Sequence, residues 1–438
     1  MGLMGRGWAS DYKSRMAIPP NPETLSIERD PVPAVWEDNA APGGPHALEP
    51  SVAPGVVVDS IHGGDVIPER LAETLGQSAG GKLLDCEIMQ AAHHREKDWG
   101  ADQVAQDLSS KLGLAGWWRV RIARCLMDFG RFPGETRPGA SHLGRFAISD
   151  PSARFLAHDQ KRELLSDFFD PISNQIESIV PNRSLKIAVH TYDRLNETGT
   201  ERPLVSLIYR SESYQRLNRM PYNVFDRVYP DHLAEFTVDR RLVARISLEL
   251  EKIGVTVAYN HPYALPEGSV EVRSQVWFFF LFARAQFLDA FPDTHDDPHF
   301  LAVWKMLMDT NLRDAQAGML RDYLHLMRTV PAAQEPFFRA CGLAYERVAR
   351  FIKQERIAHL YRHHPERPSS LAVEVRKDFV WQFEDAACRK PVLGPEGARR
   401  DNIDLITSEL ARAIRIYFDD DHAPDPHLVP GGRPPRAR

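Results

Sequence analysis

The stretch Val56-Val-Val-Asp-Ser-Ile-His62-Gly-Gly is an apolar run that ends in a histidine and two glycines. Short apolar runs of this kind are typical of buried strands. The carboxyl ends of strands in an open α/β sheet face the ligand crevice, so we expect His62 to lie at such an edge. The two glycines would let the backbone approach a metal or substrate without a clash from a Cβ atom.

Further strands and helices alternate along the chain. Strand-like runs occupy Trp118–Asp128, Leu185–His190, Pro203–Tyr209, Val255–Tyr259 and Val270–Arg273, and helical periodicity covers Asp98–Gly113, Lys161–Val180 and Asp239–Ile253. This alternation predicts an α/β fold with a mixed, largely parallel central sheet flanked by helices. From Pro292 onward the apolar residues follow helix stripes, and we expect no further strand there.

These patterns divide the chain into four expected segments. Residues 1–50 are rich in Pro, Gly and Ala and are predicted to form a flexible arm. The core is expected over 51–291 and an α-helical C-terminal extension over 292–422. The remaining residues, 423–438, are rich in Pro, Gly and Arg and are predicted to be a disordered tail.

The composition is that of a soluble globular protein. The chain has 438 residues, of which 43% are hydrophobic and 26% charged, and a formal net charge of −6. This charge argues against a nucleic-acid partner. The longest apolar run, Val276–Ala283, is too short to span a bilayer. We therefore expect a cytoplasmic protein without a membrane partner, and the C-terminal helices leave a homodimer open.

Three residues at strand ends or helix starts could bind one metal ion. A catalytic zinc usually has three protein ligands and an open fourth position, and His62, Asp98 and His190 could supply two nitrogens and an oxygen. Each residue alone also has a structural interpretation: a hydrogen-bonded histidine, or a first-turn acid at a helix start. Glu271 lies in an apolar context, which indicates either the wet face of a strand or a buried carboxylate that needs a partner.

Taken together, the motifs resemble those of the N-formylglutamate amidohydrolase family, whose fold is similar to that of the zinc carboxypeptidases. The resemblance covers about residues 53 to 290. In chain order the matching motifs are His62-Gly-Gly, Asp98-Trp-Gly-Ala101, Asp128-Phe-Gly-Arg131, His190-Thr-Tyr192, Asn260-His-Pro-Tyr263 and Glu271-Val-Arg273.

The resemblance implies a zinc-dependent amidohydrolase that attacks a C–N amide bond near a carboxylate. It implies that His62, Asp98 and His190 bind zinc, although the same ligands suit other divalent ions. It also implies that Glu271 takes the proton of the attacking water. A substrate carboxylate would be held by an arginine, and the candidate substrate-binding residues are Arg131 first, then Arg124 and Arg273, together with Asn260 and Tyr192.

One position departs from the family pattern. Gly130 stands where the family usually has an asparagine before the arginine, so an amide that would orient Arg131 or the substrate is missing. We therefore expect an N-formyl amino acid, another N-acyl amino acid or a modified peptide as substrate. The alternative from another class is a degenerate amidohydrolase fold that acts as a binding or scaffold module for a protein or peptide.

Overall fold

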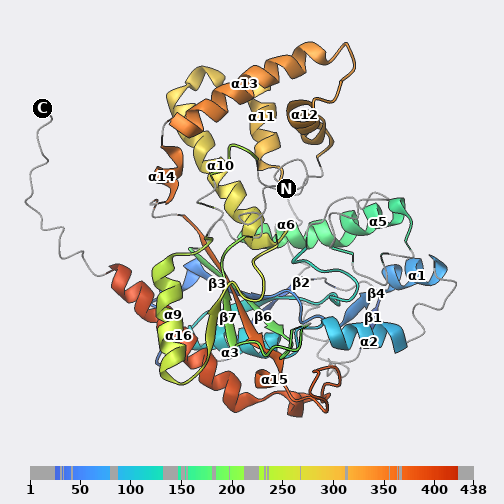
Figure 1. Cartoon of the computed structure of the whole chain (residues 1–438), viewed down its shortest axis with the longest axis vertical. Helices are drawn as coiled ribbons and strands as arrows, with labels where there is room; N and C mark the ends of the chain where they lie inside the picture. The colour runs from blue at the N-terminus through green and yellow to red at the C-terminus, as the bar shows by residue number, and fades with distance from the viewer. Residues whose placement is uncertain are drawn as a thin grey trace, which may run out of the picture.

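The computed structural model describes residues 25–422 except for 30–31, 33, 41–42, 79–86, 132–146, 149–152, 154–155, 180–183, 197, 212–225, 231–232, 234–235, 267, 311–313, 355, 363 and 365–366. Figure 1 shows a sheet flanked by helices, with a lobe of helices above it. Within these described ranges, no helix is both long and apolar enough to cross a membrane.

A seven-stranded mixed sheet forms the centre of the molecule. Its order is β2 (Ala34–Asp38), β5 (Gly116–Val120), β3 (Val56–Ser60), β6 (Leu185–Tyr192), β9 (Ser369–Arg376), β7 (Val205–Ile208) and β8 (Val257–Tyr259). The four strands β5, β3, β6 and β9 run parallel to one another. Strand β2 is antiparallel to β5, while β7 is antiparallel to β9 and parallel to β8. A separate parallel pair joins β1 (Ser26–Glu28) to β4 (Val66–Pro68).

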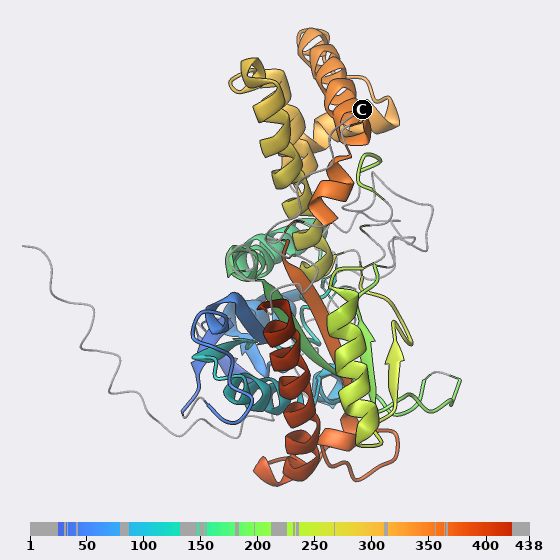
Figure 2. The same cartoon turned by 90° about the vertical axis from the view of Figure 1, so that its left-hand side faces the viewer.

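The two central strands are buried on both faces because helices cover both. Every residue of β3 and β6 is buried. On one face, Ile187 and Val189 pack with α3 (Ala101–Lys111), α9 (Arg240–Lys252) and α16 (Arg400–His422). Figure 2 shows α9 and α16 side by side over the sheet. A fully buried strand of this type reads as a continuous apolar run, which is why the sequence predicted both strands correctly.

Further helices surround the sheet on its other side. They are α1 (Glu69–Ser78), α2 (Glu87–Glu96), α5 (His158–Leu164) and α6 (Asp170–Ile179), with a π-helical turn at Leu165–Phe169 between the last two. The short α15 (Lys377–Val380) follows β9, and its Val380 packs in the same cluster as α3, α9 and α16. The predicted helices over 98–113, 161–180 and 239–253 are thus confirmed. Asp239 caps the N-terminus of α9 by accepting a hydrogen bond from Arg241 N.

The helical lobe has a core of its own. It consists of α10 (Val270–Ala290), α11 (Pro298–Met308), α12 (Ala315–Leu326), α13 (Glu335–Gln354) and α14 (Ile357–Arg362). Aromatic side chains such as Phe279, Phe287 and Trp304 fill its interior. The same apolar cluster reaches the sheet through Ala188 and Ala372, so α10 connects the lobe to the sheet.

The structure corrects four sequence-based predictions. Val270–Arg273 is the first turn of α10 and not a strand, because Ser269 caps the helix by accepting a hydrogen bond from Val272 N. Strand β9 lies at 369–376, within the segment expected to be wholly helical, and α16 returns from it to the sheet. The strand expected over 118–128 ends at Val120. Strands β1 and β2 form within the expected flexible arm. Residues 1–24 of that arm and the predicted tail, 423–438, lie outside the described residues.

Candidate metal centre and active site

The three predicted metal ligands meet at the carboxyl edge of the sheet. His62 follows β3, His190 lies near the end of β6, and these two strands are parallel neighbours. Asp98 precedes α3, and its backbone N–H donates to the carbonyl oxygen of His62. All three side chains are buried, and they form the one group of metal-ligating side chains found among the described residues. The sequence-based prediction that they converge is therefore confirmed.

The spacing of their ligand atoms fits a metal ion. His62 Nδ1 lies 3.1 Å from His190 Nδ1, and Asp98 Oδ2 lies 3.3 Å from His62 Nδ1 and 3.1 Å from His190 Nδ1. Three ligands bound to zinc at about 2.0–2.1 Å in tetrahedral geometry are roughly 3.3–3.4 Å apart. Two imidazoles and a carboxylate at this spacing are a donor set that a small divalent cation would accept with little rearrangement.

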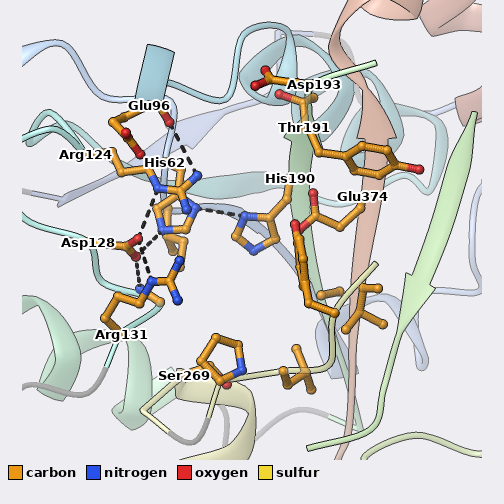
Figure 3. Close-up of a pocket in the computed structure, with 18 of the residues that line it drawn as sticks. His62, Glu96, Arg124, Asp128, Arg131, His190, Thr191, Asp193, Ser269 and Glu374 are labelled. Carbon is orange, nitrogen blue, oxygen red and sulfur yellow. Dashed lines mark hydrogen bonds and ion pairs between the residues drawn. The ribbon is translucent and has the colours of Figure 1, made fainter. Parts of the chain in front are cut away.

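A second layer of charged groups orients these ligands (Figure 3). Asp128 Oδ1 lies 2.8 Å from His62 Nε2, so His62 can donate its proton there and keep the Nδ1 lone pair for a metal. Arg124 donates to Asp98 Oδ1 at 2.8 Å and to Asp128 Oδ2 at 3.1 Å. Although burial favours the neutral acids, Arg124 and the histidines hold the pKa of both carboxyls well below the usual range.

Gly130 permits the close approach of Asp128 and His62. Its backbone N–H donates to Asp128 Oδ1 at 2.8 Å. A Cβ atom at this position would lie 3.1 Å from both Asp128 Oδ1 and His62 Cε1. Gly130, the position that departs from the family pattern, therefore lies directly beside the ligand His62. A larger side chain at this position would have to shift the Asp128–His62 pair.

His190 has a strongly perturbed acidity. Burial alone would lower its pKa, but the hydrogen bond to Asp98 and the negative charge of Glu374 raise the pKa to about 9. The surrounding carboxylates thus attract positive charge to this point of the sheet edge. A divalent cation bound here would offset the same negative charge that a proton on His190 offsets when no cation is bound.

Beside the ligand set lies a cavity of about 350 Å³. This volume suits a small molecule, since ligand pockets begin at about 300 Å³. Its walls carry His62, His190 and Arg131 and three glutamates, Glu96, Glu271 and Glu374. Figure 3 shows Arg131 and Asp128 on one side of the two histidines and Glu374 on the other.

Glu271, the glutamate expected to act as a base, is part of a buried ion triad. It lies in the first turn of α10, and its Oε1 is 2.5 Å from Lys186 Nζ. Lys186 also pairs with Asp59 at 2.6 Å, and all three side chains are at most 3% exposed. Burial favours the neutral acid, yet the charge and hydrogen bond of Lys186 lower the pKa of Glu271 to about 2.

A second glutamate, Glu374, was missed by the sequence analysis. It lies on β9 directly opposite His190 in the parallel register. Its Oε1 accepts a hydrogen bond from the Tyr263 hydroxyl at 2.5 Å, while its Oε2 is buried and has no hydrogen-bond partner among the described residues. Burial raises its pKa. The signal was a glutamate inside the apolar run Leu371–Val375, the same signal that drew attention to Glu271.

The predicted substrate-binding residues divide into two groups. Arg131, Arg124 and Tyr192 line the cavity. Arg131 Nε donates to Asp128 Oδ2 at 3.2 Å, and the Tyr192 hydroxyl donates to Pro203 O at 2.7 Å. Arg124 is committed to the two carboxylates described above, so Arg131 is the better placed of the two arginines to meet a substrate.

Arg273 and Asn260 lie outside the residues that line the cavity. Arg273 is fully buried and donates to Gly268 O and to Ser173 Oγ. Asn260 adopts a left-handed conformation with φ of 50°, and its side-chain oxygen accepts hydrogen bonds from two backbone N–H groups at the end of β7. Both residues therefore support the backbone around the site, and Asn260 fixes the loop that carries Tyr263.

Comparison with known proteins identifies the family. A family model described as N-formylglutamate amidohydrolase matches residues 55–275, just over half of the chain. No curated protein matches. Two solved structures each align with 89% of this chain at 14% sequence identity. The first is gene product Atu2144 from Agrobacterium tumefaciens, of which 95% is covered, with a TM-score of 0.41. The second is N-formylglutamate amidohydrolase from Ralstonia eutropha JMP134, of which 99% is covered, with a TM-score of 0.42. On the strength of the family match, this chain belongs to the N-formylglutamate amidohydrolase family.

Proposed function

We propose that the protein hydrolyses an amide bond next to a carboxylate with the help of one divalent metal ion, zinc being the first candidate. Membership of the family supports amide hydrolysis in general. The observation that carries the metal is the set of three ligand atoms, 3.1 to 3.3 Å apart, beside a cavity of small-molecule size. Manganese, cobalt or iron would suit the same imidazole and carboxylate ligands, so the identity of the metal is part of the test.

Each buried residue around the ligands has a defined task. When bound, a metal ion of this kind polarises the amide carbonyl and makes water a better nucleophile near neutral pH. Asp128 keeps the proton of His62 on Nε2, and Arg124 keeps Asp98 ionised with its Oδ2 directed at the histidines. Arg131 binds the substrate carboxylate through guanidinium nitrogens that Asp128 does not use.

We assign the proton transfer to Glu374 and treat Glu271 as the alternative. A general base works best when its pKa approaches the working pH, and burial moves the pKa of Glu374 in that direction. Glu271 has a pKa of about 2 and is held by Lys186, which makes it a weak base. The free Oε2 of Glu374 takes a proton from the attacking water as its oxygen bonds to the carbonyl carbon. The same proton then passes to the leaving nitrogen as the C–N bond breaks, giving a carboxylic acid and an amine.

The test measures metal content and hydrolysis together. Purified protein is analysed for bound transition metals, and release of formate from N-formyl-L-glutamate and of the acids from other N-acyl amino acids is followed. We expect about one metal ion per chain and amide hydrolysis that a chelator abolishes and zinc restores. His190→Ala should lose both the metal and the activity. A protein without stoichiometric metal, whose behaviour His190→Ala leaves unchanged, would instead favour the binding-module alternative.

A further inference from the structure

One arginine on the cavity wall has no acidic partner. Of the Arg and Lys side chains that line the cavity in the described part of the chain, all but one are neutralised. The neutralised pairs are Arg95 with Glu96, Arg124 with Asp98 and Asp128, Arg131 with Asp128, and Lys377 with Asp193. Arg202 is the exception, because the described residues offer its side chain no hydrogen bond or ion pair.

Arg202 is nevertheless held in a defined place. Its guanidinium carbon lies 5.3 Å from the centroid of the Tyr192 ring, a cation–π distance. Its Nε is shielded from solvent and has no hydrogen-bond partner among the residues that the structure describes. A partly buried guanidinium without an anion has lost hydration without compensation, so a negatively charged ligand in the cavity would restore what burial removes.

Arg202 and Arg131 lie on opposite sides of the metal ligands along the sheet edge. Arg131 lies in the segment that follows β5, and Arg202 lies just before β7. The strands from β5 to β7 are arranged in the order β5, β3, β6, β9, β7. His62 follows β3 and His190 lies on β6, and both strands fall between β5 and β7 in this order. By this strand order, Arg131 approaches the ligands from the side of β5 and Arg202 from the side of β7.

We propose that Arg202 determines substrate specificity by binding an acidic group on the half of the substrate that Arg131 does not bind. This inference rests on the proposed hydrolysis of an amide at the metal centre. The substrate class is an amide with a carboxylate or similar anion on both sides of the scissile bond, namely an N-acyl amino acid whose acyl group itself ends in an acid. A formyl group has no atom that could reach Arg202.

The test compares two acids that cannot be hydrolysed and differ in one charged group. Succinate and butyrate each have four carbons, but only succinate carries a carboxylate at both ends. Their dissociation constants are measured by calorimetry for metal-loaded wild type, Arg202→Gln and Arg194→Gln. Arg194 is the matched control, because it lies in the same loop, does not line the cavity and pairs with Glu201.

We expect wild type to bind succinate about ten to a hundred times more tightly than butyrate, since hydrogen bonds to charged groups contribute that much. Arg202→Gln should remove this preference and leave the affinity for butyrate unchanged, while Arg194→Gln should keep it. Arg202→Met, which retains apolar length over Tyr192, is a second neutral variant in case Arg202→Gln does not fold. Equal affinities in wild type, or a preference that survives both Arg202 variants, would overturn the inference.

Hydrolysis is measured separately with N-succinylglycine and N-butyrylglycine. Wild type should favour the succinyl compound in kcat/KM by a similar factor, and Arg202→Gln should lose only that advantage. Failure to hydrolyse any amide would reject the proposed function, whereas the calorimetric comparison decides the role of Arg202 on its own.

Discussion

The sheet edge and the helical lobe stabilise their interiors in different ways. At the edge formed by β3, β6 and β9, buried histidines, carboxylates and arginines satisfy one another. In the lobe the main interior cluster is aromatic and aliphatic. Helix α10 belongs to both regions, because its first turn holds Glu271 beside Lys186 and its later turns supply Phe279 and Phe287 to the lobe. Substitutions in the two regions should therefore separate loss of chemistry from loss of stability.

The largest contrast is expected between Glu374 and Glu271, the two buried glutamates that line the cavity. Glu374→Gln should lower kcat by about 10²–10⁴-fold, the usual contribution of a general base, and leave the metal bound. Glu271→Gln should keep turnover in the folded fraction and lower the free energy of unfolding by about 1–3 kcal/mol, because Lys186 loses a charged hydrogen-bond partner. Kinetics and denaturant unfolding of both variants test this. A Glu271→Gln protein with wild-type stability and no turnover would return the role of base to Glu271.

Two buried phenylalanines sharpen the comparison of the regions. Phe287 contacts Phe300, Trp304 and Phe351 in the lobe, and Phe129 stacks on Phe169 next to Asp128. Replacement of either by Ala should lower the free energy of unfolding by about 3–5 kcal/mol. Only Phe129→Ala should also weaken metal binding, because the backbone that carries Asp128 loses its support. Equal weakening of metal affinity by Phe287→Ala would mean that the lobe and the sheet edge are coupled.

The sequence predicted the parts of the site that depend on local runs, and missed those that depend on distant pairing. His62 and His190 each end a short apolar run, and a parallel sheet brings such ends together. Glu374 reaches the site because β9, which comes much later in the chain, pairs with β6. The local sequence around Glu374 does not predict which strand it pairs with or in which register. The sequence likewise did not show that Arg273 lies outside the cavity lining, because this depends on its place in a helix and not on a strand. Four alternating residues, 270–273, were too short to distinguish a strand from the first turn that Ser269 caps.

A smaller effect is expected from removing one charge near the metal ligands. Asp128→Asn keeps the size of the side chain but weakens its hold on His62 Nε2, so metal affinity should fall about 10–100-fold. The matched change in the lobe is Asp309→Asn, which alters the pair that Asp309 forms with Arg321 at 3.0 Å. It should affect unfolding and leave metal affinity unchanged. Competition titrations with a chelating dye measure both, and an unaltered affinity in Asp128→Asn would remove Asp128 from the ligand support.

The smallest effect concerns Asp226, a buried acid that joins the lobe helices to the loop at 226–230. Asp226 lies 3.0 Å from His325 Nε2 on α12 and accepts a hydrogen bond from the Tyr345 hydroxyl on α13 at 2.7 Å. Burial opposes ionisation, but the hydrogen bond and charge of His325 lower the pKa of Asp226. A carboxyl whose pKa is lowered by folding stabilises the protein above its unfolded pKa of about 3.9 and loses that contribution as pH falls below it.

Asp226→Asn should therefore lower the free energy of unfolding by about 1–2 kcal/mol at neutral pH and by less at pH 3, where wild type has lost part of the same contribution. Thermal unfolding between pH 3 and 7 measures the difference. Asp322→Asn is the control, because Asp322 also lies on α12 but forms an exposed pair with Arg328, which follows this helix. This change should alter stability little at any pH. A constant gap between Asp226→Asn and wild type across this range would show that the Asp226 carboxylate is not ionised in the folded lobe. The link from the loop at 226–230 to the lobe helices would then depend on neutral hydrogen bonds, which would widen the contrast between the lobe and the charged sheet edge.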